Sequence, residues 1–456
     1  MPHRQQAGAG YRYRGCCRVS RRGVVELKGE EAAGGRTTFG SVFAVSEFRA
    51  LWLAQVLSVL GDQLARVAVT LLVYDRTHSA VLAAVTFAAS VVPTFVGGVF
   101  LSGLADRLSR RMVMITCDLV RVVLVLAMTL PGVPLAVLVV LLFAVTMLGT
   151  PFTSARAASY SDILSDDRFV LGNAITITTY QVAQVAGFAA GGAIAGFFGI
   201  RTSLIADAAT FAASAIITRI WMRARPAARS AVDKSPGARN AEPVAGILAG
   251  VRLVFANPAL RTPMLLGWLA AFYNAPEGVA APLAHELGVG ATAVGLLLAA
   301  EATGAALGAV VFSRLVSPLT RLRWMRPLAF MSCAVLALFA LGPMFPLALL
   351  ILFTSGVFDC FQVAASAAFL SAAPERQRSQ AFGLAQAGMS LGQGAAMILA
   401  GLIAQRHSPS TAIAVVGTFG AIAAVIVAAD QAPWRVPRFR AGHPSKWPAI
   451  SRHRRG

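Results

Sequence analysis

The chain has 456 residues, of which 57% are hydrophobic and only 13% charged. A soluble domain carries about 25% charged residues, so the composition excludes an ordinary water-soluble enzyme. The 40 basic and 20 acidic residues leave a net charge of +20. On a soluble protein this surplus would suggest nucleic acid, but here the basic residues lie in tails and loops between apolar runs. This distribution indicates a polytopic membrane protein, and we expect no nucleic-acid partner.

Residues 1–46 form a polar, arginine-rich segment without the apolar core of a cleaved signal. The residues that follow contain apolar runs, and about 20 apolar residues are needed to cross a hydrocarbon core of ~30 Å. This criterion predicts an all-α membrane protein with twelve transmembrane helices, at about 49–74, 79–104, 111–131, 134–159, 172–198, 201–222, 262–284, 290–314, 325–343, 346–370, 380–404 and 410–430.

The loops predict the orientation of these spans. Loops after even-numbered spans are rich in arginine, whereas those after odd-numbered spans hold little beyond Arg76, Arg201 and Arg406. Because excess Lys and Arg marks the cytoplasmic side, and because both tails (1–46 and 431–456) are basic, we expect both termini in the cytoplasm. The protein is then a multi-pass protein of the cell membrane, surrounded by lipid and expected to be a monomer.

The longest connection, 223–261, divides the chain into two six-helix halves, 47–222 and 262–430. We predict a flexible linker followed by a short amphipathic helix at 246–255, lying on the inner membrane face. A wholly disordered linker is the alternative for its first part. Two halves of six helices suggest a secondary transporter built from repeats.

The loop after the second span reads Ser102-Gly103-Leu104-Ala105-Asp106-Arg107-Leu108-Ser109-Arg110-Arg111. It resembles the signature loop of the major facilitator superfamily, which is glycine-rich before Asp-Arg and ends in paired basic residues. The loop would form a tight turn at the membrane face, where Asp106 would accept hydrogen bonds from helix N-termini or nearby arginines, and Arg110 and Arg111 would face anionic lipid. The resemblance implies the major facilitator fold, with two pseudo-symmetric halves.

Further segments resemble the drug-exporter-like bacterial branch of that family, and the resemblance covers about residues 45–430. They are Gly61-Asp62, Asp118-x-x-Arg121, the loop 161–174 and Pro374-Glu375-Arg376. Gly187-Phe188-Ala189-Ala190-Gly191-Gly192 resembles the antiporter motif, although Phe188 replaces its proline. Because small residues let helices approach closely, we predict that spans 5 and 8 pack together between the halves, with Gly304 and Gly308 on span 8.

Ionisable groups within the spans are the candidates for coupling and gating, because each must be paired, neutral or facing a cavity. Only two basic residues, Arg66 and Arg121, are placed clearly inside. The spacings Asp62–Arg66 and Asp118–Arg121 predict two local pairs, with structural or gating roles. Glu277, Glu301 and Asp359 have no obvious local partner. A buried carboxyl without a partner suits a proton carrier, so the proton-coupling candidates, in order of preference, are Glu301, Glu277, Asp359 and Asp62.

We expect an acid surplus in an otherwise apolar cavity, which suggests substrates that are hydrophobic and neutral or cationic. Aromatic and amide side chains suit adaptable recognition. The candidates to line this cavity are Tyr180, Gln181, Gln184, Phe272, Tyr273, Asn274, Gln362 and Gln386.

These features favour a proton-coupled exporter of a small molecule, such as a drug, an antibiotic or a secreted metabolite. A transporter of lipid-like substrates and a non-transporting sensor are the alternatives. No phosphate-binding GxxxxGK[ST] loop, HExxH or GxSxG motif is present, and the cysteines lack metal-ligand spacing. We therefore expect neither a primary pump nor an enzyme, and no metal or cofactor beyond the proton gradient.

Overall fold

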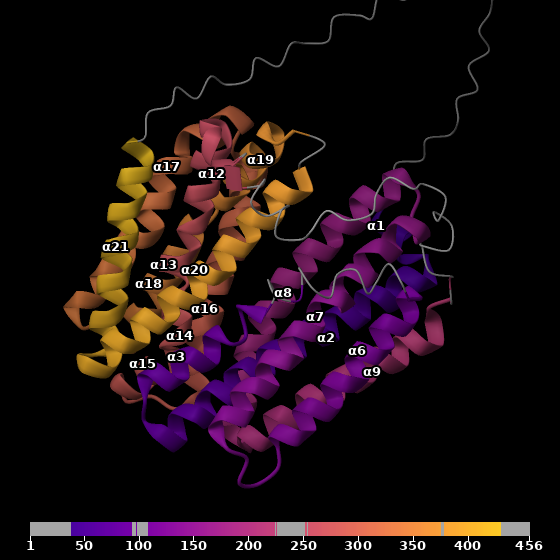
Figure 1. Ribbon diagram of the computed structural model, residues 1–456, viewed down its shortest axis with the longest axis horizontal. Coiled ribbons are helices and arrows are strands. Elements are labelled where there is room, and N and C mark those ends of the chain that lie inside the picture. Colours follow the sequence, from indigo (N-terminus) through magenta and orange to yellow (C-terminus); the bar gives the residue numbers. More distant parts are fainter. Residues whose placement is uncertain are drawn as a thin grey trace, which may run out of the picture.

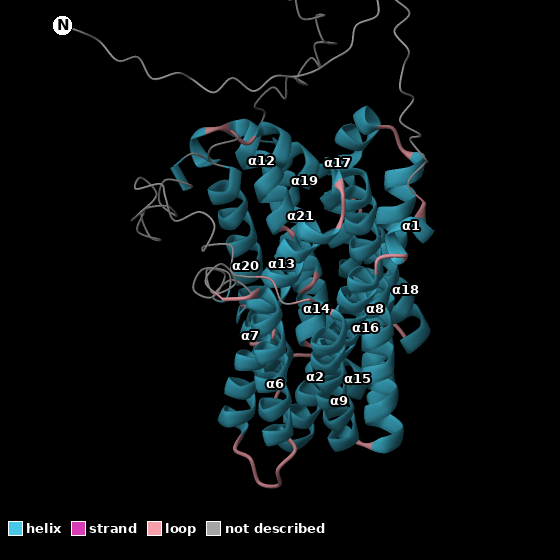
Figure 2. Ribbon diagram, turned by 90° about the vertical axis from the view of Figure 1, so that its right-hand side faces the viewer, coloured by secondary structure: helices cyan, strands magenta, loops and turns pink. Residues whose placement is uncertain are grey.

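The computed structural model describes residues 38–93, 97, 108–223, 225, 251, 252, 254–374 and 378–429, and within these ranges every regular element is a helix (Figure 2). The first part of the chain forms α1 (Phe39–Phe43), α2 (Ser46–Thr77), α3 (Ala80–Ala88), α6 (Arg110–Met128), α7 (Leu135–Ile163), α8 (Asp166–Phe198) and α9 (Ile200–Trp221). The second part forms α12 (Pro258–Trp268), α13 (Ala270–Tyr273), α14 (Ala275–Gly278), α15 (Ala280–Glu286), α16 (Ala291–Leu315), α17 (Pro318–Ala334), the 3-10 helix η1 (Val335–Leu341), α18 (Phe345–Phe358), α19 (Phe361–Ala372), α20 (Arg378–Arg406) and α21 (Pro409–Ala429).

Nine helical segments of the described chain are long and apolar enough to cross a membrane. Three other expected spans coincide with α3, with the 19-residue α6 and with the short helices α12 to α15. α6 carries four charged residues, and the expected second span continues beyond α3 into residues outside the description. The all-helical fold is as predicted, whereas the count of twelve stays a prediction. The amphipathic helix expected at 246–255 falls mostly outside the described residues.

Two spans that the sequence predicts as continuous are interrupted. The seventh is broken into α12, α13, α14 and α15, and Pro276 and Pro282 lie at these breaks. Proline lacks the N–H that an uninterrupted helix requires, and its ring clashes with the preceding turn. The tenth span is broken between α18 and α19 at Asp359 and Cys360. Two candidate carboxyl groups, of Glu277 and Asp359, therefore lie where helices are discontinuous.

The helices form two bundles that meet at one end of the molecule and diverge toward the other (Figure 1). The first bundle contains α2 and α6 to α9, the second α12 to α21, and α3 packs on both α2 and α20. The end where short turns connect α2 to α3 and α20 to α21 is here called the turn end. There, Gln405 Oε1 accepts hydrogen bonds from the Ala80 amide and the Ser79 hydroxyl. The opposite end, here called the basic end, holds the first turn of α6 and the last turn of α9.

Helices α8 and α16 pack together between the bundles, as predicted for spans 5 and 8. The contact is made by Gly192, where an added Cβ would lie 2.6 Å from the Cα of Gly295. Gly304 and Gly308, which the sequence assigns to this interface, pack instead against the backbone of α18, at Phe353 and Val357. The correction follows from helix geometry: Gly295 is 9 residues before Gly304, so the two glycines lie on different faces of α16.

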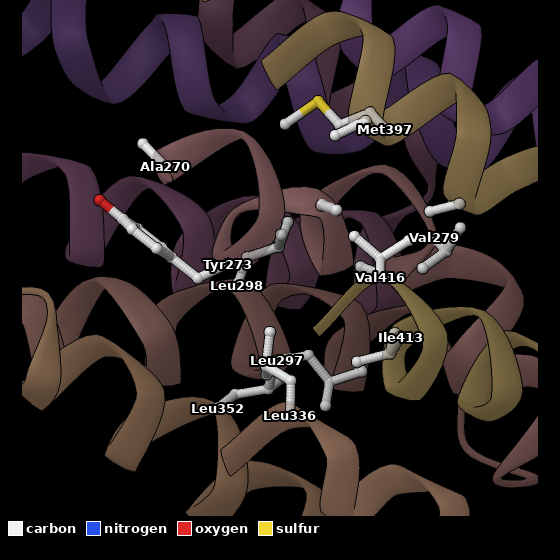
Figure 3. Close-up of a cluster of buried hydrophobic side chains, with 14 of the residues drawn as sticks. Ala270, Tyr273, Val279, Leu297, Leu298, Leu336, Leu352, Met397, Ile413 and Val416 are labelled. Carbon is white, nitrogen blue, oxygen red and sulfur yellow. The ribbon is translucent and has the colours of Figure 1, made fainter. Parts of the chain in front are cut away.

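The largest apolar core lies in the second bundle and extends to α3 and α8. Figure 3 shows the side chains of α16, α21 and their neighbours meeting there, with the Tyr273 hydroxyl pointing away from the aliphatic groups. Leu297 and Ile413 are 1% and 0% exposed. Because lipid tails are as apolar as these side chains, close van der Waals packing in this core holds the broken helix α12 to α15 in place.

Candidate functional site

Arg121 occupies the centre of the first bundle and is 1% exposed. Its Nε donates to the Val145 carbonyl at 3.0 Å and its Nη1 to the Ser58 hydroxyl at 3.1 Å. The guanidinium carbon lies 4.9 Å from the centre of the Phe211 ring and 5.9 Å from that of Phe152. These contacts come from α2, α7 and α9, so one side chain ties four helices together.

Carboxyl groups surround this guanidinium. Asp62 and Asp118 each place an oxygen 3.9 Å from an Arg121 nitrogen. Asp118 also accepts a hydrogen bond of 2.6 Å from the Ser214 hydroxyl. Asp207, on α9, is fully buried within electrostatic range of Asp62 and Arg121, and neither of its oxygens has a hydrogen-bond partner among the described residues. One cation therefore faces three carboxyl groups.

The predicted pair Asp118–Arg121 is present, whereas the predicted pair Asp62–Arg66 is not. Within the described chain Asp62 forms its ion pair with Arg121. Arg66 instead donates to the Ser90 carbonyl at 3.4 Å and lies 5.5 Å from the centre of the Phe87 ring. Spacing of one turn places two residues on one helix face, but the rotation of α2 against α6 decides which partner Asp62 reaches.

A cavity of about 320 Å³ opens beside this cluster, and Tyr180 is one of its lining residues. It also contains Arg156, which the sequence analysis missed when it placed only two basic residues inside the spans. Arg156 lies near the end of α7 and is 8% exposed. Its position three residues before the expected end of span 4, at 159, suggests a location at the membrane surface. In the structure it is buried instead, within electrostatic range of the phenols of Tyr160 and Tyr180.

Three carboxyl groups of the second bundle form a second cluster. Glu301, on α16, is 6% exposed and lies within electrostatic range of both Glu277 and Asp359. Its Oε1 is buried and has no hydrogen-bond partner among the described residues. The structure thus brings together three of the four proton-coupling candidates. The fourth, Asp62, lies in the first bundle.

Asp359 is held by a short hydrogen-bonded chain. The Tyr273 hydroxyl donates to Asp359 Oδ1 at 2.5 Å, and Gln362 Nε2 donates to the Tyr273 oxygen at 2.8 Å. The same amide nitrogen lies 2.9 Å from the Gly267 carbonyl. These hydrogen bonds connect α12, α13 and the break between α18 and α19. A change in the hydrogen bonding of Asp359 therefore affects contacts of several helices.

A cavity of about 440 Å³ lies beside Asp359 and Tyr273. Seven of the eight predicted cavity residues line one of the two cavities: Tyr180 the smaller, and Gln181, Gln184, Tyr273, Asn274, Gln362 and Gln386 the larger. The prediction for Phe272 is wrong, because its side chain packs against Gly420 of α21. Neighbouring residues on a helix point about 100° apart, so Phe272 and Tyr273 face different surroundings.

The expected acid surplus of the cavity is also wrong. The residues that line the two cavities include the carboxyl groups of Asp62 and Asp359, but also the guanidinium groups of Arg66, Arg121 and Arg156. Glu277 and Glu301 are not among the lining residues. All three guanidinium groups belong to the first bundle, and none of the described lining residues of the second bundle is basic, so the two walls differ in charge.

Half of the predicted signature-loop residues can be placed. Asp106 and Arg107 lie outside the described residues. Arg110 forms an ion pair with Asp162, and Arg111 donates to the Arg219 carbonyl at the end of α9. These two arginines were expected to face lipid, but they join α6 to α7 and α9. The free carbonyl groups at a helix end attract such cations.

The family model described as Major Facilitator Superfamily matches residues 51–277 and 269–454. Among curated proteins, the "Enterobactin exporter EntS" of Shigella boydii serotype 4 is 28% identical over 273 residues, or 59% of this chain and 63% of that protein. The protein of the same name from Escherichia coli O157:H7 is 28% identical over 277 residues, with the same coverage. The matched region thus spans less than two thirds of these relatives.

Solved structures resemble the chain in fold. A peptide transporter of the POT family in complex with sulfate has a TM-score of 0.68 and 13% identity, covering 86% of this chain and 95% of that one. A bacterial homologue of the human lysosomal transporter Spinster, inward-facing and occupied, has a TM-score of 0.63 and 15% identity, covering 84% of this chain and 94% of that one.

Proposed function

Because this chain belongs to the Major Facilitator Superfamily, a family of multi-pass membrane transporters, we propose that it exports a small, largely hydrophobic compound in exchange for protons. The observation that carries the proposal is the cluster of Glu277, Glu301 and Asp359 beside a cavity of about 440 Å³. Glu301 lies within electrostatic range of the other two. Neighbouring carboxyl groups cannot all be ionised at low cost in a bilayer, so we expect at least one to hold a proton.

The direction of transport follows from the predicted orientation. The larger cavity includes Phe369 and Phe382, which lie in the parts of α19 and α20 nearer the basic end. If that end faces the cytoplasm, the substrate enters the cavity from inside the cell. The curated relatives named as exporters favour the same direction.

Alternating access requires the contact at the turn end to open. There Gly196 of α8 meets Thr292 of α16, and the ring of Tyr74 lies 5.9 Å from that of His285. In our proposal these contacts separate when the substrate leaves, and proton transfer at the carboxyl cluster favours the return of the cavity to the basic end.

Transport of a lipid-like substrate is the second candidate. An apolar groove of about 450 Å³ lies between α16 and α18, lined by Leu296, Ala299, Ala300, Thr303, Leu349, Leu350 and Phe353. Leu296 and Leu350 are 42% and 58% exposed. An acyl chain would fit these apolar side chains.

Extrusion of a neutral naphthylamine dye from cells tests the main proposal. We expect cells with the protein to accumulate less dye, and the difference to disappear when a protonophore collapses the proton gradient. Glu301→Gln should abolish gradient-driven extrusion, whereas the control Glu286→Gln, at an exposed carboxyl outside the cluster, should retain it. Extrusion that survives the protonophore would contradict proton coupling. Extrusion of a fluorescent phospholipid but not of the dye would favour the second candidate.

A further inference from the structure

Positive charge dominates the wall that the first bundle presents to its cavity. Arg66, Arg121 and Arg156 line it, with Asp62 the one carboxyl group among the described lining residues. In a site shielded from water, charges of one sign raise the local concentration of the opposite ion. A ligand can bind only to a guanidinium group whose donors are not already used by the protein.

Arg121 is not free. Two carboxyl groups lie 3.9 Å away, its Nε and Nη1 donate to Val145 and Ser58, and two aromatic rings flank it. A ligand would have to displace contacts between four helices to reach it. We therefore assign Arg121 to the structure of the bundle.

Arg156 differs in every one of these respects. It is 8% exposed, and its Nε is buried without a hydrogen-bond partner among the described residues. The groups within electrostatic range of it are two phenols, of Tyr160 and Tyr180, and not a carboxylate. A buried cation without an anion is costly, and here it lines an open cavity.

Arg66 lines the same cavity, and its Nε is also buried without a hydrogen-bond partner within the described chain. Its hydrogen bond to the Ser90 carbonyl is long, at 3.4 Å. Glu277 and Asp62 lie within electrostatic range but form no ion pair with it. The two guanidinium groups therefore have donor capacity that the described residues do not use.

We propose that this wall binds an acidic group of the transported compound, and that the substrates are organic acids with an apolar body. The planar guanidinium of Arg156 pairs with a carboxylate through two parallel hydrogen bonds, and Arg66 adds a second positive charge. Tyr180 lines the arginine cavity and its neighbour Gln181 lines the larger cavity. A compound held at the arginines can thus extend its body along α8 to the side chains of the second bundle.

This inference rests on the proposed transport function and narrows its substrate class. It is tested by binding of three pyrene probes with the same apolar body: pyrene butyrate, pyrenyl butanol and the trimethylammonium analogue. Binding to the purified full-length protein in a neutral detergent is followed by fluorescence. We expect the carboxylate to bind about tenfold more tightly than the alcohol, and the ammonium to bind least, because a hydrogen bond to a charged group contributes about a factor of ten in affinity.

Arg156→Gln is expected to remove that tenfold preference, with a larger loss of affinity for the carboxylate than for the alcohol. Arg156→Lys should keep part of it, since the charge remains and the paired geometry is lost. The control Arg201→Gln removes an exposed arginine outside both cavities and should leave all three affinities unchanged. Equal binding of the three probes, absence of binding, or a preference that Arg156→Gln retains would overturn the inference.

The dye extrusion assay separates this outcome from failure of the transport proposal. A protein that extrudes the neutral dye but does not prefer the carboxylate probe is an exporter without an acid-binding wall. A preference for the carboxylate that depends on Arg156, in a protein that does not extrude the dye, supports the acid-binding wall and argues against export of the dye.

Discussion

Carboxyl groups at the centre of the first bundle lie around one guanidinium, whereas in the second bundle Asp359 is held by a phenol. Asp62 and Asp118 each lie 3.9 Å from Arg121. In the second bundle, Asp359 accepts from Tyr273, and Glu301 has an oxygen without a partner among the described residues. The two bundles contain a similar number of carboxyl groups, but they differ in the groups that stabilise them: a guanidinium in the first bundle and a phenol in the second.

The difference separates two uses of buried charge. A carboxyl group beside a fixed arginine holds helices together through that arginine. A carboxyl group that has only neutral donors gains or loses a proton as its surroundings change. In the second bundle, Glu277 lies in α14 and Asp359 at the junction of α18 and α19, where the helices are interrupted, whereas Glu301 lies within the continuous helix α16.

Replacement of Arg121 is expected to have the largest effect. Arg121→Gln leaves Asp118 and Asp207 buried without a cation, which costs about 3–5 kcal/mol of unfolding free energy. Denaturant unfolding of the purified protein in detergent measures the loss. Arg110→Gln is the matched control, because its partly exposed ion pair with Asp162 contributes about 0–1 kcal/mol. Equal losses in the two variants would show that the first bundle does not depend on the central arginine.

Disturbing the contact between the bundles is expected to have an intermediate effect on the free energy of unfolding. Gly192→Val places a side chain against the backbone of Gly295, and such overpacking costs about 1–3 kcal/mol. Gly383→Ala serves as the control, since a Cβ there meets no atom within 4 Å and alanine stabilises a helix by roughly 0.5–1 kcal/mol. The same unfolding assay compares them. If Gly192→Val unfolds like the wild type, α8 and α16 do not pack as closely as described.

The smallest change in stability is expected for the residue with the largest expected change in function. Glu301→Gln replaces an unpartnered carboxyl group with an amide of equal size, so the unfolding free energy should change by less than about 1 kcal/mol. Gradient-driven dye extrusion should nevertheless be lost. A destabilisation as large as that of Arg121→Gln would mean that Glu301 is a structural charge, and the contrast between the bundles would fail.

Several features of the site could be predicted from the sequence because they are local. Long apolar runs predict membrane helices whatever packs against them, and an isolated glutamate in such a run, such as Glu301, is conspicuous without any structure. Amide and phenol side chains near the middle of spans were also correct candidates for a cavity. Arg156 was missed because it lies only three residues before the expected end of span 4, where an arginine usually reaches the membrane surface.

Composition, hydropathy and the loop motif by themselves determined the all-helical membrane fold, the family and the carboxyl groups that stand out in the spans. Only the tertiary structure decided that Asp62 pairs with Arg121 instead of Arg66, that Phe272 faces α21, and that three arginines line one wall. The physical reason is that hydropathy and periodicity describe one helix at a time. Which side chains meet depends on how each helix is rotated about its axis and where it breaks, and packing between residues far apart in the chain sets both.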